Sequence, residues 1–314
     1  MFLRKLLFLL LIIPINSFAK EKPPAFISKI LNYPGPVFIY NFKTAVPTMP
    51  LLQINDLPGT FKFSGQALTK NKKGLFLNHL GTGRIYQWSG NSQDGYWKRI
   101  DSTFFTGYNF LSILFSVDST IYSFGGIGFW YQNGNVRQFS FESQEWNAKL
   151  LNKSIPWHKS DISFFYIDTL NKNVYFNDLG RYHDTSLKDY IDSARINKIY
   201  RISLIDGAVS ELGRSTRQKG SFFGITPWGS LTTNDKIVDV LNNRMYTLSE
   251  HVQNNLLRVL AKSNKKMFEW QYCFWMDSAL YFGDPHYGYD SVIIHKKDLI
   301  STGETFYSPE KSTK

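Results

Sequence analysis

Short segments in which apolar and polar residues alternate recur along the chain, and clusters of Gly, Asn, Asp and Ser separate them. Segments 135–141 (NVRQFSF) and 198–204 (KIYRISL) show this pattern clearly, because their apolar side chains fall on one face of an extended strand. Such a face has to be covered by a neighbouring layer of structure. The pattern therefore predicts an all-β protein built from short strands.

The first of two repeated sequence templates contains an apolar residue, another at +3, a small residue at +4 and a further apolar residue at +10. Its copies are Val136, Phe139, Ser140 and Trp146; Ile199, Ile202, Ser203 and Val209; and Leu257, Leu260, Ala261 and Met267. Ile85, Trp88 and Ser89 form a weaker copy, in which Trp97 comes two residues late. One template repeated in this way indicates a repeat architecture.

The second template is an apolar residue followed by an aromatic residue within a short strand. Its aromatic residues are Phe76, Tyr122, Tyr175, Tyr246 and Tyr281, which are 46, 53, 71 and 35 residues apart. The mean interval is close to the roughly 50 residues that one blade of some propellers occupies. A single blade cannot bury both of its faces, whereas blades arranged around an axis cover one another. The two templates together predict a β-propeller.

The segment Thr120–Trp146 (TIYSFGGIGFWYQNGNVRQFSFESQEW) resembles a kelch repeat. The double glycine, the aromatic residue and the tryptophan of that repeat correspond to Gly125, Gly126, Phe139 and Trp146. Ser140 stands where the family usually has aspartate. The other segments keep the spacing without the double glycine, so the resemblance extends over about 61–308 as a degenerate array. It implies a propeller of four-stranded blades, and no particular activity, because that fold hosts many unrelated ones.

The glycines of this segment also invite comparison with a glycine-rich loop that binds phosphate. Such a loop lies between a strand and the start of a helix. Here Gly125-Gly126-Ile127-Gly128 leads into aromatic residues and then into another alternating strand. We therefore expect these glycines to serve the backbone where the chain leaves a blade strand.

Five blades are expected, at 61–102, 106–152, 160–213, 222–270 and 271–308. The strand-like segment 36–42 either adds a strand to the last blade and closes the ring, or belongs to a sixth, incomplete blade. A short helical insert is predicted at 185–197, where apolar residues recur at helical spacing. The expected division is a signal peptide at 1–19, an N-terminal segment with the ring-closing strand at 20–60, the propeller at 61–308 and a polar tail at 309–314.

Residues 1–19 combine the three parts of a secretory signal peptide. Arg4 and Lys5 are basic, an apolar run covers 6–13, and Ser17-Phe18-Ala19 provides a small-x-small cleavage site. The alternative is a membrane anchor, which needs about 20 apolar residues. Because Pro14 closes the run, we expect export to the periplasm or the exterior, with no membrane span after cleavage. The oligomeric state is left open.

Charge and cysteine content narrow the classes of partner. The formal net charge is +11, but the basic residues are scattered over several loops, whereas a nucleic-acid interface needs a concentrated stripe. No nucleic-acid partner is therefore predicted. Cys273 is the only cysteine, so no internal disulfide can form, and its apolar and aromatic neighbours favour a buried, inert thiol.

Propellers bind ligands through the loops at one end of the central channel. The loops expected there are 126–134, 154–160, 179–184, 214–223 and 283–290. The candidate ligand-binding residues in them are Trp130, Tyr131, Trp157, His158, Arg181, His183, Arg214, Asp284, His286 and Tyr287. Aromatic and polar groups of this kind suit a glycan or a protein partner. The alternative is that the aromatic residues only fill gaps between blades.

Signals for catalysis are weak. The six histidines show no metal-binding pair at i, i+2 or i, i+4, and no Gly-x-Ser-x-Gly motif occurs. Oxidases of the kelch group link a cysteine to a tyrosine, and Tyr272, which adjoins Cys273, does not suit that geometry. We predict a non-catalytic binding or scaffold protein without cofactor or metal. The alternative is a carbohydrate-active hydrolase or lyase, in which two carboxylates or a His–Tyr pair would meet at the channel mouth, near Asp184, Asp284, His183 and His286.

Overall fold

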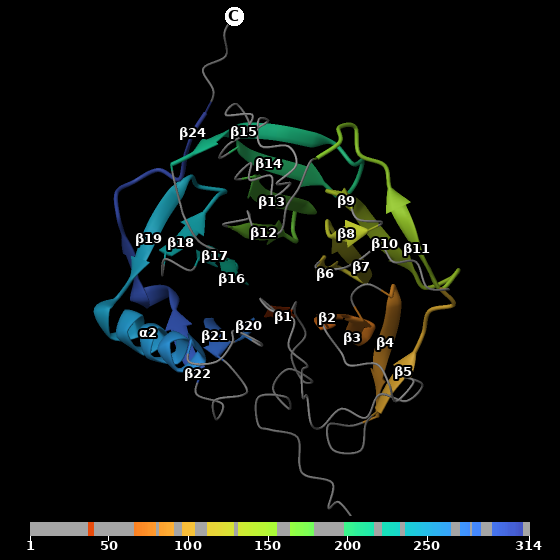
Figure 1. Ribbon diagram of the computed structural model, residues 1–314. Coiled ribbons are helices and arrows are strands. Elements are labelled where there is room, and N and C mark those ends of the chain that lie inside the picture. The colour runs from red at the N-terminus through yellow and green to blue at the C-terminus, as the bar shows by residue number, and fades with distance from the viewer. Residues whose placement is uncertain are drawn as a thin grey trace, which may run out of the picture.

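The computed structural model of this 314-residue chain describes residues 37–40, 66–79, 82–90, 96–103, 112–128, 131–155, 164–178, 198–216, 222–232, 236–264, 271–276, 278–283 and 291–309. Within these residues the strands form three four-stranded sheets, two five-stranded sheets and one two-stranded ribbon. The larger sheets lie around a common centre like the blades of a propeller (Figure 1). The predicted all-β propeller of antiparallel sheets is therefore confirmed.

The sheets are numbered here in chain order. The first contains β2 (Gln66–Asn71), β3 (Gly74–His79), β4 (Arg84–Ser89) and β5 (Tyr96–Arg99). The second contains β6 (Ile113–Val117), β7 (Thr120–Phe124), β10 (Val136–Ser140) and β11 (Glu145–Lys149), and the ribbon of β8 (Ile127–Gly128) and β9 (Tyr131–Gln132) lies between β7 and β10 along the chain.

The third sheet contains β12 (Phe165–Asp168), β13 (Asn173–Asp178), β14 (Lys198–Ser203), β15 (Val209–Ser215) and β24 (Tyr307–Ser308). The fourth contains β16 (Phe222–Thr226), β17 (Gly229–Thr232), β18 (Lys236–Asp239), β19 (Arg244–Leu248) and β23 (Leu299–Ser301). The fifth contains β1 (Val37–Tyr40), β20 (Gln271–Met276), β21 (Ala279–Gly283) and β22 (Ser291–His295). One α-helix, α2 (Glu250–Asn264), and the 3₁₀ helix η3 (Lys296–Asp298) complete the described elements.

Strands from both ends of the chain share the fifth sheet. β1 pairs antiparallel with β20, and β1 lies close to the centre of the ring (Figure 1). The segment expected to be strand-like at 36–42 thus adds a strand to the sheet formed by the last strands of the propeller.

Four of the tight turns between strands share one device, a polar side chain that bonds to the turn which follows it. Asp168 accepts bonds from the backbone N–H of Asn171 (3.1 Å) and from its side-chain amide (2.7 Å). Asp239 and Asn242 repeat this arrangement at 3.0 and 2.8 Å. Hydroxyl groups take the same place in the turns at 140–144 and 203–207. These side chains satisfy backbone donors that no strand pairs with, and so fix the length of each turn.

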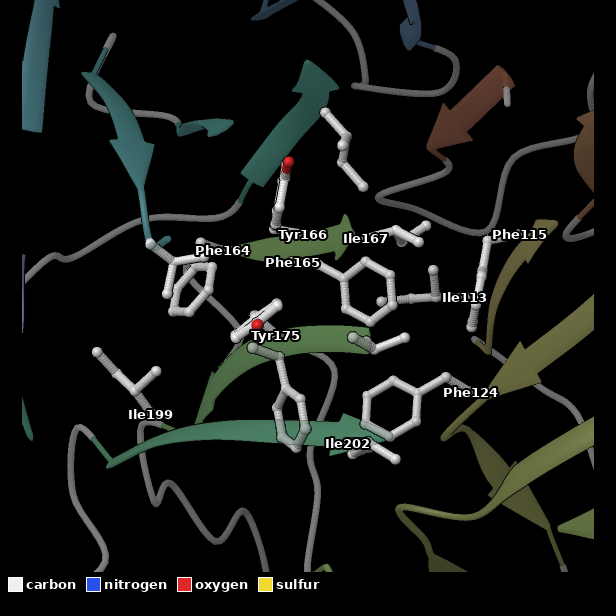
Figure 2. Close-up of a cluster of buried hydrophobic side chains, with 14 of the residues drawn as sticks. Ile113, Phe115, Phe124, Phe164, Phe165, Tyr166, Ile167, Tyr175, Ile199 and Ile202 are labelled. Carbon is white, nitrogen blue, oxygen red and sulfur yellow. The ribbon is translucent and has the colours of Figure 1, made fainter. Parts of the chain in front are cut away.

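Aromatic rings fill the space between neighbouring sheets. The largest cluster of buried residues joins the second, third and fourth sheets, and Figure 2 shows part of it. The ring of Phe165 lies 5.7 Å from that of Phe115, and the ring of Phe176 lies 4.8 Å from that of Phe124. All four rings are fully buried. Because such rings bury large apolar areas, the high aromatic content is used chiefly in holding sheet against sheet.

The position of the described helix differs from what the first template predicts. Leu257 belongs to a segment interpreted as a blade strand, yet it lies in α2. Val252 and Leu256, one turn apart, are buried in a cluster with Val292 and Ile294 of β22, while Leu257 is exposed. Apolar residues at i, i+3 and i+4 also form one face of a helix, so the template could not separate the two structures. The helical insert predicted at 185–197 lies outside the described residues.

The C-terminal segment, called here the C-terminal strap (residues 296–309), runs along the outer edges of two sheets. Its strand β23 pairs with β19 and its strand β24 pairs with β15. Between these strands, the side chain of Phe306 enters the largest buried cluster and its ring meets that of Phe164 edge-on at 4.8 Å. The side-chain amide of Asn243 both donates to and accepts from the backbone of Tyr307, at 2.8 Å each. The strap thus joins the fourth sheet to the third.

Candidate functional site

The connections between strands differ between the two ends of the sheets. Because neighbouring strands are antiparallel, successive connections lie at alternate ends. The end called here the turn end carries the connections 72–73, 90–95, 118–119, 141–144, 169–172, 204–208, 227–228, 240–243 and 277–278, none longer than six residues. The end called the loop end carries all connections of seven or more residues, at 41–65, 100–112, 125–135, 150–164, 179–197, 249–270 and 284–290, as well as the shorter ones at 80–83, 216–221 and 233–235. Binding residues of scaffolds with short turns on one side are expected in the longer connections.

All five loops predicted to hold the ligand-binding residues follow strands that finish at the loop end. Two of the ten candidate residues are described. Tyr131 lies on β9, with its backbone opposite Gly128 of β8. Arg214 lies on β15, where its backbone is opposite Lys198 of β14 on one side and Ser308 of β24 on the other. Arg214 is exposed. Outside the described residues lie Trp130, Trp157, His158, Arg181, His183, Asp284, His286 and Tyr287, as do the alternative carboxylate Asp184 and the thiol side chain of Cys273.

The double glycine lies where β7 gives way to the β8–β9 ribbon. Gly125 and Gly126 have φ angles of 67° and 111°, which residues with a Cβ rarely adopt. The N–H of Gly125 donates to the carbonyl of Asn135 (2.8 Å), and the carbonyl of Gly126 accepts from the N–H of Asn133 (3.0 Å). These glycines therefore close the base of a loop, and no helix follows them that would form a phosphate cradle.

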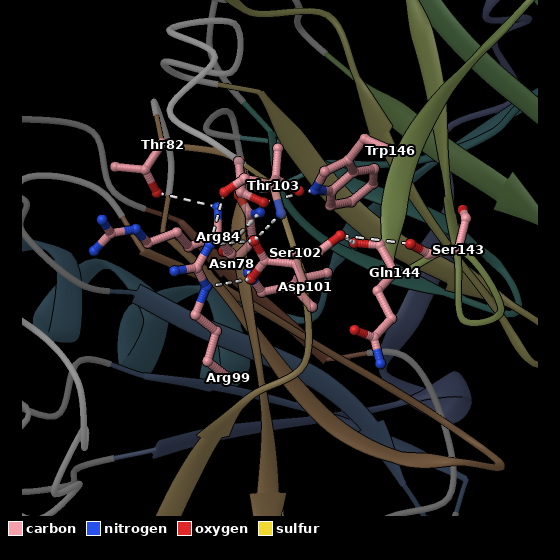
Figure 3. A network of polar contacts seen from close by, with 12 residues as sticks. Asn78, Thr82, Arg84, Arg99, Asp101, Ser102, Thr103, Ser143, Gln144 and Trp146 are labelled. Carbon is pink, nitrogen blue, oxygen red and sulfur yellow. Dashed lines mark hydrogen bonds and ion pairs between the residues drawn. The ribbon is translucent and has the colours of Figure 1, made fainter.

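A buried carboxylate, Asp101, organises the junction between the first and second sheets (Figure 3). Its Oδ1 accepts bonds from the backbone N–H of Ile85 (2.8 Å) and from Nε of Arg99 (3.1 Å). Its Oδ2 accepts from Nη2 of Arg99 (2.9 Å) and from the N–H of Thr103 (3.1 Å). A bidentate guanidinium and two backbone donors leave the buried charge fully compensated.

The same junction continues into the second sheet. The N–H of Ser102 donates to the carbonyl of Gln144 (2.9 Å), in the turn between β10 and β11. Nε1 of Trp146 donates to the carbonyl of Gly83 (2.7 Å), in the connection between β3 and β4 (Figure 3). The residues around Asp101 therefore lock one sheet to the next. Sequence reasoning missed this network, although Arg99 and Asp101 stand two residues apart, on the same face of an extended chain.

The buried carboxylates of the described residues are Asp101, Asp168 and Asp239. Each one accepts hydrogen bonds from the turn or strand end that it stabilises. Within the described part of the chain, no three side chains of His, Cys, Asp or Glu come together in a way that could hold a metal ion. The hydrogen bonds of Asp101, Asp168 and Asp239 thus assign these three carboxylates to the scaffold.

Three buried tyrosines of the second and third sheets lie on strands that meet the turn end. Burial, together with the nearby carboxylates of Asp168 and Asp239, raises the pKa of Tyr166 to about 12. Burial also raises the pKa of Tyr122 and of Tyr175. The rings of Tyr166 and Tyr175 lie 6.2 Å apart. All three phenols therefore ionise at a higher pH than a solvent-exposed tyrosine does.

The raised pKa of Tyr166 predicts a loss of stability in alkali. Between pH 10 and pH 12 the unfolded chain gives up this proton while the folded protein keeps it, so the free energy of unfolding falls as the pH rises. The slope from one such group is at most about 1.4 kcal/mol per pH unit. Urea unfolding between pH 9 and pH 11.5 should show a shallower decline for Tyr166→Phe than for the wild type. Equal slopes would contradict the assignment.

Comparisons with known proteins give little further information. No protein-family model matches the chain, and no curated protein matches it. Among solved structures, one titled "Structure of YjhT" is similar to this chain, with 12% sequence identity and a TM-score of 0.38. The similarity covers 74% of this chain and 81% of the chain in that structure.

In the described part of the chain, no helix is long and apolar enough to cross a membrane.

Proposed function

We propose that this chain is an exported, non-catalytic β-propeller of the kelch type, which binds a glycan or a partner protein through its loop end. The observation that carries the proposal is the asymmetry between the two ends of the sheets. One end is closed by short turns whose polar side chains bond to their own backbones. The longest connections all belong to the other end, where a rigid scaffold can present variable binding residues.

The kelch assignment is supported by the use of its signature residues. Gly125 and Gly126 terminate β7, the second strand of its sheet. Phe139 on β10 packs against Trp146 on β11, with ring centroids 5.5 Å apart. The indole of Trp146 also bonds to the first sheet, so the tryptophan serves both its own blade and the next. The proposal of export depends on residues 1–19, whose basic, apolar and small-residue segments have the order of a signal peptide.

The test is a glycan array probed with the purified chain, together with Trp157→Ala and His286→Ala variants. We expect either substitution to weaken binding of a captured glycan about tenfold, since loss of one stacking or hydrogen-bonding group costs roughly 1–2 kcal/mol. Trp228→Ala, in a short turn at the turn end, is the tryptophan control, and its unfolding midpoint has to be compared with that of the wild type because its ring packs against that of Trp275 (4.8 Å). His295→Ala, at the end of β22 that lies away from the loop end, is the matched histidine control.

The controls should bind like the wild type. Binding that survives both test substitutions would remove these residues from the proposed face. If no glycan is captured, the same four variants would be used in crosslinking to protein partners in the exported fraction. Retention of the chain inside the cell would contradict the proposal of export.

A further inference from the structure

Aliphatic side chains occupy the tips of neighbouring turns in the third sheet, where polar residues are usual. Leu170, in the turn between β12 and β13, is 86% exposed, and Ile205, in the turn between β14 and β15, is 67% exposed. Leu150, just after β11, is 87% exposed. Single exposed apolar residues are ordinary, whereas several gathered at one place indicate a binding surface.

Backbone contacts bring these three positions together. The N–H of Leu204 donates to the carbonyl of Lys172 (2.8 Å), which joins the turn of Ile205 to the turn of Leu170. The N–H of Asn152 donates to the carbonyl of Gly207 (3.2 Å), which places the segment after β11 beside the same turn. We call Leu150, Leu170 and Ile205 the apolar turn patch.

Charged side chains of both signs lie around the apolar turn patch, and the lysines outnumber the carboxylates by one. Lys149 donates from Nζ to the carbonyl of Ile205 (3.0 Å), and Lys153 is exposed in the same segment. Lys172 is paired with Asp118 at 3.0 Å, and both side chains are about half exposed. The carboxylate of Asp206 accepts a bond from the N–H of Ala208 in its own turn. Three lysines thus face two carboxylates, in a chain whose net charge is +11.

The projecting side chains of the patch favour a partner whose surface can deform around them. A side chain that is 86–87% exposed has almost no protein around it, so Leu150 and Leu170 project as separate knobs. A protein interface needs a surface complementary to each knob. The boundary between lipid headgroups and acyl chains accepts apolar knobs of any outline, and anionic lipids attract the lysines around them.

We infer that the apolar turn patch docks the protein on an anionic lipid surface. Leu170 and Ile205 enter the interfacial layer, Leu150 lies at its margin, and the lysines contact the headgroups. Because Leu170 and Ile205 are at the turn end of the third sheet, docking leaves the loop end directed away from the lipid. Leu170 and Ile205 lie in other connections than the proposed ligand-binding residues, whereas Leu150 shares the connection 150–164 with Trp157. The double variant Leu170→Ser, Ile205→Ser therefore tests the inference separately from that face.

The experiment is co-sedimentation with vesicles of phosphatidylcholine alone or with about one-third phosphatidylglycerol, using the chain with and without residues 1–19. The wild type should bind the anionic vesicles and much less to the neutral ones. The triple variant Leu150→Ser, Leu170→Ser, Ile205→Ser should bind at least about a hundredfold more weakly, because each buried aliphatic side chain contributes roughly tenfold. Equal unfolding midpoints would show that the variant is folded.

Leu241→Ser is the matched control, because Leu241 has the position of Leu170 in a turn with the same bonding pattern, which joins the third and fourth strands of the fourth sheet, and is less exposed. It should bind vesicles like the wild type. The inference is overturned if the wild type does not bind, if the triple variant binds equally well, or if neutral and anionic vesicles bind alike. It is also overturned if sedimentation shows a dimer that only the triple variant loses, since the patch would then be a contact between copies.

Discussion

Replacing Phe306 by alanine is expected to lower the free energy of unfolding by about 3–5 kcal/mol, the usual cost of truncating a fully buried phenylalanine. Phe306 has no exposed surface, and its ring meets that of Phe164 edge-on within the largest buried cluster. Within the described part of that cluster, Phe306 is the only fully buried residue that belongs to the C-terminal strap. The substitution therefore removes apolar contacts and loosens the strap at the same time.

The loss should exceed that of an ordinary core substitution, because backbone pairing depends on this side chain. The N–H of Thr216 donates to the carbonyl of Phe306 (2.9 Å). The side-chain amide of Asn243 forms two hydrogen bonds with the backbone of the next residue, Tyr307. If the ring no longer holds the strap, these bonds are exposed to water and β24 can separate from β15.

Urea unfolding at neutral pH measures the effect, and Ile300→Ala provides the control. Ile300 lies on β23 of the same strap, and its side chain is exposed, so its loss should change the free energy of unfolding by no more than about 0.5 kcal/mol. A loss below about 1 kcal/mol for Phe306→Ala would show that the strap contributes little in solution.

Local patterns in the sequence predict the type of architecture because each blade is built from similar short strands, whose apolar residues have to be buried. Alternation in 135–141 and 198–204 identifies β10 and β14, in which two residues three apart are buried in each case: Val136 with Phe139, and Ile199 with Ile202. Residues three apart in a strand point to opposite faces, and Val136 and Phe139 accordingly enter different buried clusters. The same spacing misled the interpretation of Leu257, since a helix brings positions three and four apart onto one face.

Turn chemistry explains why the aromatic template gave uneven intervals. The sequences IDTLNKNVY (167–175) and VDVLNNRMY (238–246) form the same four-residue turn, with an aspartate bonded to an asparagine three residues later. Tyr175 then lies on the second strand of its sheet, whereas Tyr246 lies on the fourth. A turn sequence specifies how two strands are joined, but it does not specify which two strands of the blade they are.

The contacts of the candidate site were less accessible to sequence reasoning than the fold. Asp101 gathers groups from β4, β5 and the segment after β5, and the same junction reaches Gln144 in the second sheet. None of these residues has a distinctive local motif, because the network depends on how two sheets meet. The loop end follows from strand connectivity alone, while the partners of Trp157 and His286 depend on connections outside the described residues.

Removing the carboxylate of Asp101 should be the most damaging polar substitution in the described structure. Asp101→Ala would remove the carboxylate that pairs with the guanidinium of Arg99, which keeps only its bond to the carbonyl of Thr103 among those described here (2.7 Å), and would orphan the N–H groups of Ile85 and Thr103. Breaking a buried ion pair in this way typically costs about 3–5 kcal/mol, because the remaining charge is left unpaired. Urea unfolding should therefore show a loss comparable to that of Phe306→Ala.

Asp118→Ala separates this explanation from a general effect of losing an aspartate. Asp118 is paired with Lys172 at 3.0 Å, but both side chains are about half exposed, so water compensates either charge when its partner is removed. The expected loss is below about 1 kcal/mol. If the two substitutions destabilised the protein equally, the burial of Asp101 would not be the cause. A larger loss for Asp101→Ala than for the double variant Arg99→Met, Asp101→Ala would instead identify the stranded guanidinium as the main cost, since the double variant removes both charges together.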